Sequence, residues 1–362
     1  EYAKNIITLL DDGNTIPFIA RYRKEMHGSM DDQLIREFAE KLEYLRGLDK
    51  RRDEIRSLID AQEKLTDEIN LALDKAATLS ELEDIYRPYR PKRKTRASIA
   101  KEKGLEPLAN DILKQEKGFD PSKSAVDYID EEKGVTSVED AIQGAMDIIA
   151  ELVSDNAEIR KRIRNLTNAN GVLVSVATDE EKDSVYKNYY DYKEPVKKIA
   201  GHRVLAVNRG EKEGFLKVSV ETDSEKPLNS IFRAMITDKN QLCSDIIREA
   251  CTDAYQRLIY PSIEREVRND LTDTAAENAM KVFAVNLKQL LMQPPVKGKT
   301  VLALDPGYRT GCKTAVVDST GKVLDTTVIY PTHSDKKIQE SKQTLLRLIK
   351  KHHVDIISIG NG

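Results

Sequence analysis

The chain has 362 residues, of which 33% are charged, and its charges sum to −3 at pH 7 with a pI near 6.1. This length accommodates two or three domains, and the balance excludes a globally basic nucleic-acid binder while leaving room for a local basic patch. We find no apolar run of the roughly 20 residues that a membrane helix needs and no signal-peptide pattern, so we expect a cytoplasmic protein without a membrane partner. Three cysteines (Cys243, Cys251 and Cys312) lack metal-ligand spacing and are expected to be reduced thiols.

Residues 1–170 show mainly helical patterns. A first helix over residues 1–12 ends at Gly13, and a long one over about 31–62 has apolar residues at helical spacing. Ser29 with Asp32 gives a weak start signal for the long helix, and Thr66 caps the next one. Ser80 with Glu83 forms the capping-box pattern of another helix. The sequence therefore predicts an α-helical hairpin region.

A basic stretch, residues 86–103, follows these helices, and we name it the basic strap. It has eight Lys and Arg against one acid, whereas residues 31–84 have sixteen acids against nine bases. Bases mixed with tyrosines can neutralise phosphates and stack on nucleotide bases. The alternative is that the strap forms salt bridges with the acidic helices of its own domain. The candidate nucleic-acid contacts are Arg87, Arg90, Lys92, Arg93, Lys94 and Arg96.

Residues 105–298 continue the helical pattern with a small α/β insertion. A helix over 137–154 is capped by Ser137, and a basic run over 160–164 is interpreted as the solvated face of a helix that starts near Asp155. His202 is interpreted as a structural hydrogen-bonding residue rather than a catalytic base. Predicted strands cover 171–178 and 215–221, 201–210 is ambiguous, helices 242–260 and 275–292 flank Pro261, and a linker covers 292–299.

The stretch 301–321 (VLALDPGYRTGCKTAVVDSTG) reads as a strand, a second strand over 315–318 and a turn, before a third strand over 322–330. This is the opening hairpin of an α/β ribonuclease H-like domain, and the same hairpin opens actin-like kinases and ATPases. A fourth strand over 354–360 runs into the last residue of the chain without an acid. A strand that ends there uncovered suggests a fragment cut through a domain.

Asp305, at the tip of the first of these strands, is the candidate acid of the hairpin. Metal-dependent nucleases of this class hold two Mg²⁺ ions about 4 Å apart with clustered carboxylates, and one carboxylate cannot build such a site. Asp318 lies in a strand that does not usually supply a ligand. Asp305 is then either a residual metal or phosphate contact or an Asp that caps its own turn. Arg309 and Lys313 suit a phosphate backbone or a solvated edge equally, and the spacing Asp305-x-Gly307-x-x-Thr310 is similar to an actin-like phosphate loop that would need a second loop.

Several long strings in this chain resemble the bacterial Tex family of transcription accessory proteins. They are residues 15–28 (TIPFIARYRKEMHG), 82–108 (LEDIYRPYRPKRKTRASIAKEKGLEPL), 202–214 (HRVLAVNRGEKEG), 301–318 and 357–362 (ISIGNG). The resemblance implies a helical Tex N-terminal region and a YqgF-type ribonuclease H-like domain. In the family a helix-hairpin-helix region and an S1-type RNA-binding domain follow. We predict a helical region over 1–170, a mixed α/β and helical segment over 171–298, and the first part of the YqgF domain over 299–362.

The sequence and the resemblance together predict a transcription accessory protein that binds RNA or DNA. We expect a non-catalytic scaffold that needs no cofactor and whose main binding domains lie C-terminal to this chain. We also expect contacts with the transcription or translation machinery. The alternative is a metal-dependent nuclease or resolvase of the ribonuclease H-like class that uses Mg²⁺ and Asp305.

Overall fold

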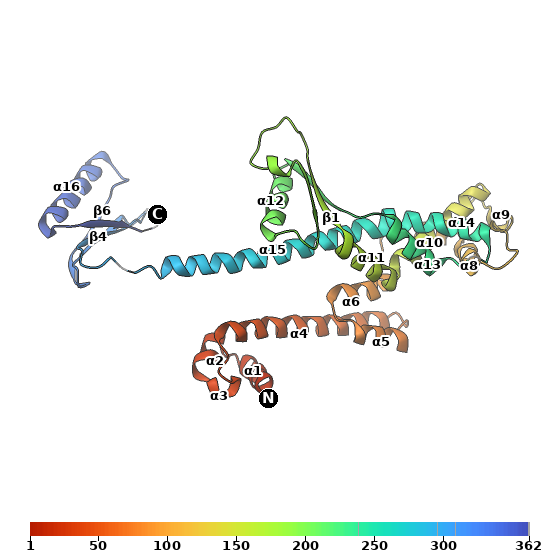
Figure 1. Ribbon diagram of the computed structural model, residues 1–362, viewed down its shortest axis with the longest axis horizontal. Coiled ribbons are helices and arrows are strands. Elements are labelled where there is room, and N and C mark those ends of the chain that lie inside the picture. The colour runs from red at the N-terminus through yellow and green to blue at the C-terminus, as the bar shows by residue number, and fades with distance from the viewer. Residues whose placement is uncertain (238, 295, 308, 361–362) are drawn as a thin grey trace. The chain divides into compact units, whose positions relative to one another are not determined.

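The computed structural model describes residues 1–237, 239–294, 296–307 and 309–360. Pro295 of the predicted linker, Tyr308 of the predicted hairpin and residues 361–362 of the predicted ending lie outside the described residues. The chain divides into two compact units, Glu1–Ala279 and Met280–Gly362 (Figure 1). The first is mainly helical with one small sheet, and the second is α/β. The predicted fold class is confirmed.

The first helices of unit 1 enclose a small apolar core. The helices are α1 (Tyr2–Asp11), α2 (Ile16–Tyr22), α3 (Lys24–His27) and the long α4 (Asp32–Asp60), and the core residues are Ile6, Leu9, Ile19 and Ile35. Gly13 ends the first helical segment in a left-handed conformation, as predicted. The start signal of α4 was misread: the Asp31 carboxylate, not Ser29, accepts the Leu34 N–H at 2.8 Å.

The next two helices, α5 (Asp67–Lys75) and α6 (Leu79–Tyr86), pack on the second half of α4. Thr66 caps α5, as predicted, by accepting the N–H of Ile69. The predicted capping box of Ser80 and Glu83 is wrong, because Ser80 already lies inside α6. Thr78 caps this helix instead, since its extended backbone lets the hydroxyl accept the Glu81 N–H.

The largest core of unit 1 surrounds α10 (Val138–Asp155), which Ser137 caps as predicted. Its apolar face bears Ala141, Ala145 and Ile149, all fully buried. The short side chains of this face let other helices approach closely. The surrounding helices are α7 (Arg96–Glu102), α8 (Glu106–Lys114), α9 (Pro121–Ala125), α11 (Ala157–Asn170), α13 (Glu225–Met235) and α14 (Gln241–Asp253).

A three-stranded antiparallel sheet of order β2-β1-β3 forms the α/β insertion of unit 1. Both predicted strands are confirmed as β1 (Val172–Ala177) and β3 (Leu216–Glu221), and β2 (Asp191–Pro195) pairs on the other side of β1. The ambiguous residues form helix α12 (Gly201–Lys212). His202 is exposed near the start of this helix, and no hydrogen bond of its ring is present among the described residues, so the structure does not support its predicted hydrogen-bonding role.

The predicted end of a helix at Tyr260 is wrong, because the chain remains helical from α14 into α15 (Tyr260–Leu291). A π-helical segment, Ala254–Ile259, precedes the proline. Proline in a helix lacks an N–H donor and clashes with the carbonyl four residues earlier, and a wider turn moves that carbonyl away from the proline ring. The helix therefore continues past Pro261.

Unit 2 contains a four-stranded sheet of order β6-β5-β4-β7. β4 (Val301–Asp305), β5 (Cys312–Val317) and β6 (Val323–Ile329) are antiparallel, and β7 (Ile356–Ile359) runs parallel to β4 after helix α16 (Asp335–His352). The helix covers one sheet face, where Leu348 packs with Leu302 and Val316. The predicted strands are confirmed, within a few residues at their ends.

Candidate nucleic-acid interface

The basic strap forms three short pieces. Helix α6 ends at Tyr86, a 3-10 turn covers Arg87–Tyr89, and α7 starts after Thr95. Pro88 and Pro91 disfavour a longer helix, and residues 90–94 form no regular element. Thr95 restarts the helix with a capping box, in which its side chain accepts the Ser98 N–H and the Ser98 hydroxyl accepts the Thr95 N–H. The strap is thus extended only in its middle.

Three of the six predicted contacts, Arg87, Arg90 and Lys92, form ion pairs with acids of α6 and α10. Arg90 pairs with Glu83 of α6, and Lys92 pairs with Asp155 and, at 3.4 Å, with Glu151 of α10. Arg87 Nε lies 3.3 Å from the Asp155 carboxylate without the alignment of a hydrogen bond. Burial lowers the pKa of Arg87, and the nearby Arg160 charge lowers it further. The intramolecular alternative therefore describes this half of the strap, although most of the partner acids lie on α10 rather than on the helices before the strap.

The other three predicted contacts, Arg93, Lys94 and Arg96, are exposed to solvent. Arg93 has no ion pair or hydrogen bond from its side chain among the described residues. Lys94 lies 3.7 Å from Glu102, with 70% of its side chain exposed, so solvent screens this pair strongly. Burial raises the pKa of Asp147, and the positive charges of Arg257 and Arg96 reduce this rise. These three side chains remain accessible to a phosphate.

The second basic run, residues 160–164, is only in part the solvated face that the sequence predicted, because Lys161 and Arg162 are exposed whereas Arg160 is buried and Arg164 is mostly buried. Arg160 is 1% exposed, and its Nε donates to Asp84 at 2.5 Å. Asp84 and Glu266 each bridge Arg160 and Arg164, at distances of 2.5–2.9 Å. Burial opposes the charge of Arg164, but its pairs with Asp84 and Glu266 raise its pKa overall. The buried ionic network ties α6, α11 and α15 together.

This network was detectable in the sequence only indirectly. Ile159, Ile163 and Thr167 follow one face of α11, and Arg160 and Arg164 lie next to them on the same buried side. A basic side chain next to an apolar position of an amphipathic helix can be buried in the core when acidic side chains form ion pairs with it there. Those acids lie 76 and 106 residues away along the chain, so no local pattern identified them.

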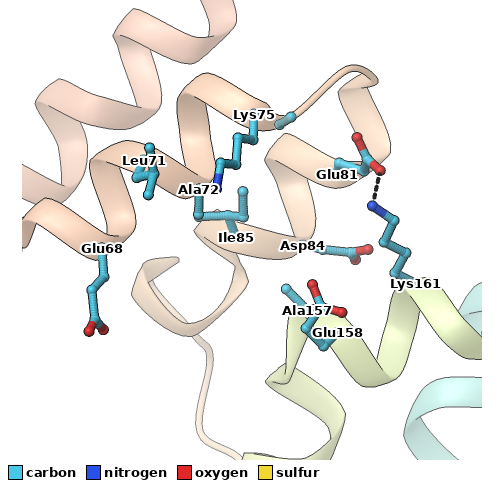
Figure 2. Close-up of a pocket in the computed structure, with 11 residues that line it drawn as sticks. Glu68, Leu71, Ala72, Lys75, Glu81, Asp84, Ile85, Ala157, Glu158 and Lys161 are labelled. Atoms are coloured by element: carbon cyan, nitrogen blue, oxygen red, sulfur yellow. Dashed lines mark ion pairs between the residues drawn. The ribbon is translucent and has the colours of Figure 1, made fainter.

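A cavity of about 410 Å³ lies beside this network, between α5, α6 and α11 (Figure 2). Leu71, Ala72 and Ile85 line it with apolar surface, and Lys161 and Glu81 form an ion pair of 2.8 Å at its edge. The Lys161 pair is the main cause that lowers the pKa of Glu81. The cavity has charges of both signs, so it gives no clear preference for an anion or a cation.

The predicted hairpin places Asp305 at the exposed end of β4, directly opposite Lys313 of β5. Both residues lie on the sheet face away from α16, because they alternate with the buried Leu302 and Val316. A shallow cavity of about 470 Å³ on this face is lined by Ala303, Asp305, Lys313, Ala315, Thr326 and Val328. Arg309 is exposed in the turn between β4 and β5.

The residues around Asp305 do not fit a two-metal site. In the described parts of the chain, no group of three or more His, Cys, Asp and Glu side chains lies close enough to hold a metal ion. Asp318 instead caps the turn before β6, where its carboxylate accepts the N–H groups of Thr320 and Lys322. The Thr320 hydroxyl also donates to this carboxylate. Its hydrogen bond is the main cause that lowers the pKa of Asp318, and the two N–H groups lower this pKa further. Two-metal chemistry cannot be derived from this arrangement.

The three cysteines are free, as predicted from their spacing, and the structure also shows that they are buried. Burial raises the pKa of Cys251 to about 12, so this thiol is protonated at neutral pH and unreactive. Among the described residues, no helix combines the length and the apolar content that a membrane crossing requires.

Comparisons with known proteins identify three consecutive parts of the chain. Residues 1–60 match the Tex-like protein N-terminal domain, 116–283 match the Tex central region-like model, and 299–362 match the Tex protein YqgF-like domain. The chain belongs to the Tex family. The resemblance that the sequence strings suggested is therefore confirmed, and the Tex YqgF-like match coincides with the sheet and helix α16 of unit 2.

Several relatives align with nearly the whole of this Tex-family chain, over about half or less of their own length. It is 45% identical to the protein YdcI of Bacillus subtilis over 365 residues, which covers 100% of this chain and 51% of that protein. It is 40% identical to the transcriptional accessory protein Tex of Neisseria gonorrhoeae (98% of this chain, 47% of that one) and 31% identical to the human S1 RNA-binding domain-containing protein 1 (99% and 37%). The chain spans about half the length of the bacterial relatives that it matches.

Proposed function

We propose that this chain is the scaffold half of a transcription accessory protein that binds RNA or DNA and acts without catalysis. The observation that carries this proposal is the alignment of nearly the whole chain with part of two relatives that are named transcriptional accessory protein Tex and S1 RNA-binding domain-containing protein 1. The main nucleic-acid-binding domains would then lie in the part of those relatives beyond the aligned half. The partners would be a nucleic acid and the transcription or translation machinery in the cytoplasm, without a membrane.

The exposed half of the basic strap supports direct contact with the nucleic acid. Arg93, Lys94 and Arg96 lie close together in sequence, and their charges are largely available because the adjacent Arg90 and Lys92 already neutralise Glu83 and Asp155. Each phosphate that a Lys or Arg neutralises releases counterions, so the salt dependence of binding counts such contacts. The strap then adds affinity without reading sequence.

Titration of the chain with a labelled oligouridine at several salt concentrations tests this contact. Replacing Arg93, Lys94 and Arg96 with Gln should flatten the slope of log affinity against log salt by about 2 units, because three phosphate contacts are lost. Thermal stability should barely change, since these side chains hold few contacts within unit 1.

The matched control is the double variant Arg90→Gln, Lys92→Gln. These residues are used within unit 1, so this variant should leave the slope nearly unchanged and lower the melting temperature by about 2–4 °C. An unchanged slope in the triple variant, or an equal loss in both variants, would show that the exposed strap is not a phosphate site.

The alternative function is a metal-dependent nuclease, which the position of Asp305 at the end of β4 favours. It requires further carboxylates from outside the described residues, because Asp305 is not part of a metal-ligand cluster among them. The test is Asp305→Asn in a chain extended to the length of the relatives. The scaffold function is wrong if that protein cleaves a branched or single-stranded substrate with Mg²⁺ and the substitution abolishes cleavage while binding persists.

A further inference from the structure

Positive charge is concentrated in the YqgF-like part of the chain. Residues 299–362 contain ten Lys and Arg against six Asp and Glu, a balance of +4, whereas the whole chain carries −3. The whole of this excess lies on α16, which has six Lys and Arg against Asp335 and Glu340. The charge asymmetry indicates an anionic partner for this part of the molecule.

Helix α16 uses its apolar side to cover the sheet. Leu345, Leu348 and Ile349 pack with Leu302 and Val316, so the opposite side of the helix faces solvent. Figure 1 shows α16 beside the strands of this sheet. Lys336, Arg347 and Lys350 follow that outward side at helical spacing, and Lys342 lies on its flank. We name these four residues the α16 basic face.

The side chains of the α16 basic face are exposed and form no ion pair or hydrogen bond with other described residues. This distinguishes them from the other two bases of the helix. Lys337 pairs with Glu340 at 2.9 Å, and Lys351 pairs with Asp325 at 2.9 Å. The basic face is therefore not explained by ion pairing within unit 2.

Helix stability does not explain the basic face either. A cation is favourable in the last turn of a helix, near its negative end, and unfavourable in the first turn. The charge of Lys350, in the last turn, stabilises the helix, but Lys336 lies in the first turn of α16, where a positive charge interacts unfavourably with the helix dipole. The row of charge thus runs along the whole helix, over about 21 Å between Lys336 and Lys350 at 1.5 Å per residue.

We propose that the α16 basic face binds the phosphate backbone of a nucleic acid. An extended row of unpaired cations matches a polyanion with regularly spaced charges, and the exposed amide of Gln343 between them can donate to phosphate oxygens. A lipid surface fits less well, because Leu345, Leu348 and Ile349 pack against the sheet and only Ile338 and Leu346 of the large apolar side chains of α16 are exposed for insertion. The face is also separate from Asp305 and Lys313, which lie on the other side of the sheet.

This inference rests on the proposed function and names a second contact surface for it. The test compares the unmodified chain with a quadruple variant in which Lys336, Lys342, Arg347 and Lys350 are replaced by Gln. Binding to a labelled oligouridine and to a labelled DNA duplex is measured between about 50 and 200 mM salt. We expect the salt slope on oligouridine to fall by about 3 units, because four contacts are removed.

The matched control removes three lysines and one arginine from exposed positions in unit 1. It is the variant in which Lys187, Arg209, Lys212 and Lys226 are replaced by Gln. It changes the net charge equally and should leave the slope within experimental error. Circular dichroism of each variant establishes that the helices are retained, and a second α16 variant with Arg347→Lys alone should keep the slope.

The other outcomes separate this inference from the proposed function. Equal loss in the control variant would mean that only net charge matters, and the inference would be wrong. If the strap variant flattens the slope but the α16 variant does not, the inference fails and the proposed function stands. Failure of the chain to bind either probe even at low salt overturns the α16 site, whereas binding by a protein of the relatives' full length would still support the proposed function. Preferential binding of the α16 face to phosphatidylserine vesicles would also overturn it.

Discussion

Arg160 shows how a charged residue becomes part of a protein core. Its guanidinium donates to Asp84, Ser262 and Glu266, and Arg164 completes a network in which two acids bridge two bases. Removal of a charge from water is costly unless its partners compensate for the lost hydration. Even here one nitrogen, Nη1 of Arg160, finds no partner among the described residues. The network therefore provides specific positioning of α6, α11 and α15 more than net stability.

Substitution of Arg160 tests that interpretation. We expect Arg160→Met to lower the free energy of unfolding by about 3 kcal/mol, because it leaves the buried Asp84 with one partner fewer. The measurement is urea unfolding followed by circular dichroism. Arg162→Met is the matched control, since Arg162 is an exposed neighbour on α11 and should change stability by less than about 0.5 kcal/mol. Equal effects of the two substitutions would contradict a structural role for the network.

At the scale of elements, local signals determined where helices and strands form. Apolar periodicity gave the type of α4, α10, β1 and β3, and the Asp31 carboxylate and the Ser137 hydroxyl fixed the starts of the two helices. Predicted helix ends were wrong where two possible capping residues lie close together, as Thr78 and Ser80 do. They were also wrong where the backbone accommodates a proline, as the π-helical segment before Pro261 does. The basic strap is a third case, because its sequence could not separate the bases that pair with acids of α6 and α10 from those that do not. The first group is Arg87, Arg90 and Lys92, and the second is Arg93, Lys94 and Arg96.

The contact between β6 and α16 predicts a pH dependence. Lys351, and after it His352, hydrogen-bond with Asp325 and lower its pKa to about 2. A carboxyl group with a lowered pKa in the folded state stabilises the protein above its unfolded pKa of about 3.9, and this stability is lost as the pH falls through about 2. Asp325→Asn should therefore be less stable than the unmodified chain at neutral pH, with the difference vanishing between about pH 4 and pH 2.

Urea unfolding midpoints at a series of pH values check this prediction. Lys351→Met serves as the complementary variant, because it removes the first of the two partners and should show a similar but smaller effect. A stability difference for Asp325→Asn that stays constant down to pH 2 would mean that the ion pairs do not contribute as described.

At the scale of the whole molecule, each of the two units has a core of its own. Unit 1 contains a large core around α10, whereas the core of unit 2 is small and centres on Leu302, Val316 and Leu348. A small core buries less apolar surface per residue and gives lower stability. The charges differ as well, since the YqgF-like residues 299–362 are basic within an acidic chain. The Tex-family chain thus combines an acidic, mainly helical part with a basic α/β part.

Separate cores predict separate unfolding transitions. In differential scanning calorimetry, Leu348→Ala should lower only the first transition, that of unit 2, and Ile247→Ala should lower only the second. Each truncation removes a fully buried side chain and should cost about 2–5 kcal/mol. A single transition that both substitutions shift alike would show that the units unfold as one.

The sequence by itself determined the fold class, the family and most helices and strands of this protein. Those properties depend on neighbours along the chain, such as periodicity, caps, turns and contiguous strings, which a sequence displays directly. Only the tertiary structure decided which charges are paired, buried or exposed. Arg160 meets its acids 76 and 106 residues away, Lys92 meets Asp155 63 residues away, and the α16 basic face exists because the sheet covers the other side of that helix. The availability of a charge depends on such distant contacts, because burial and ion pairing are set by packing in space rather than by position in sequence.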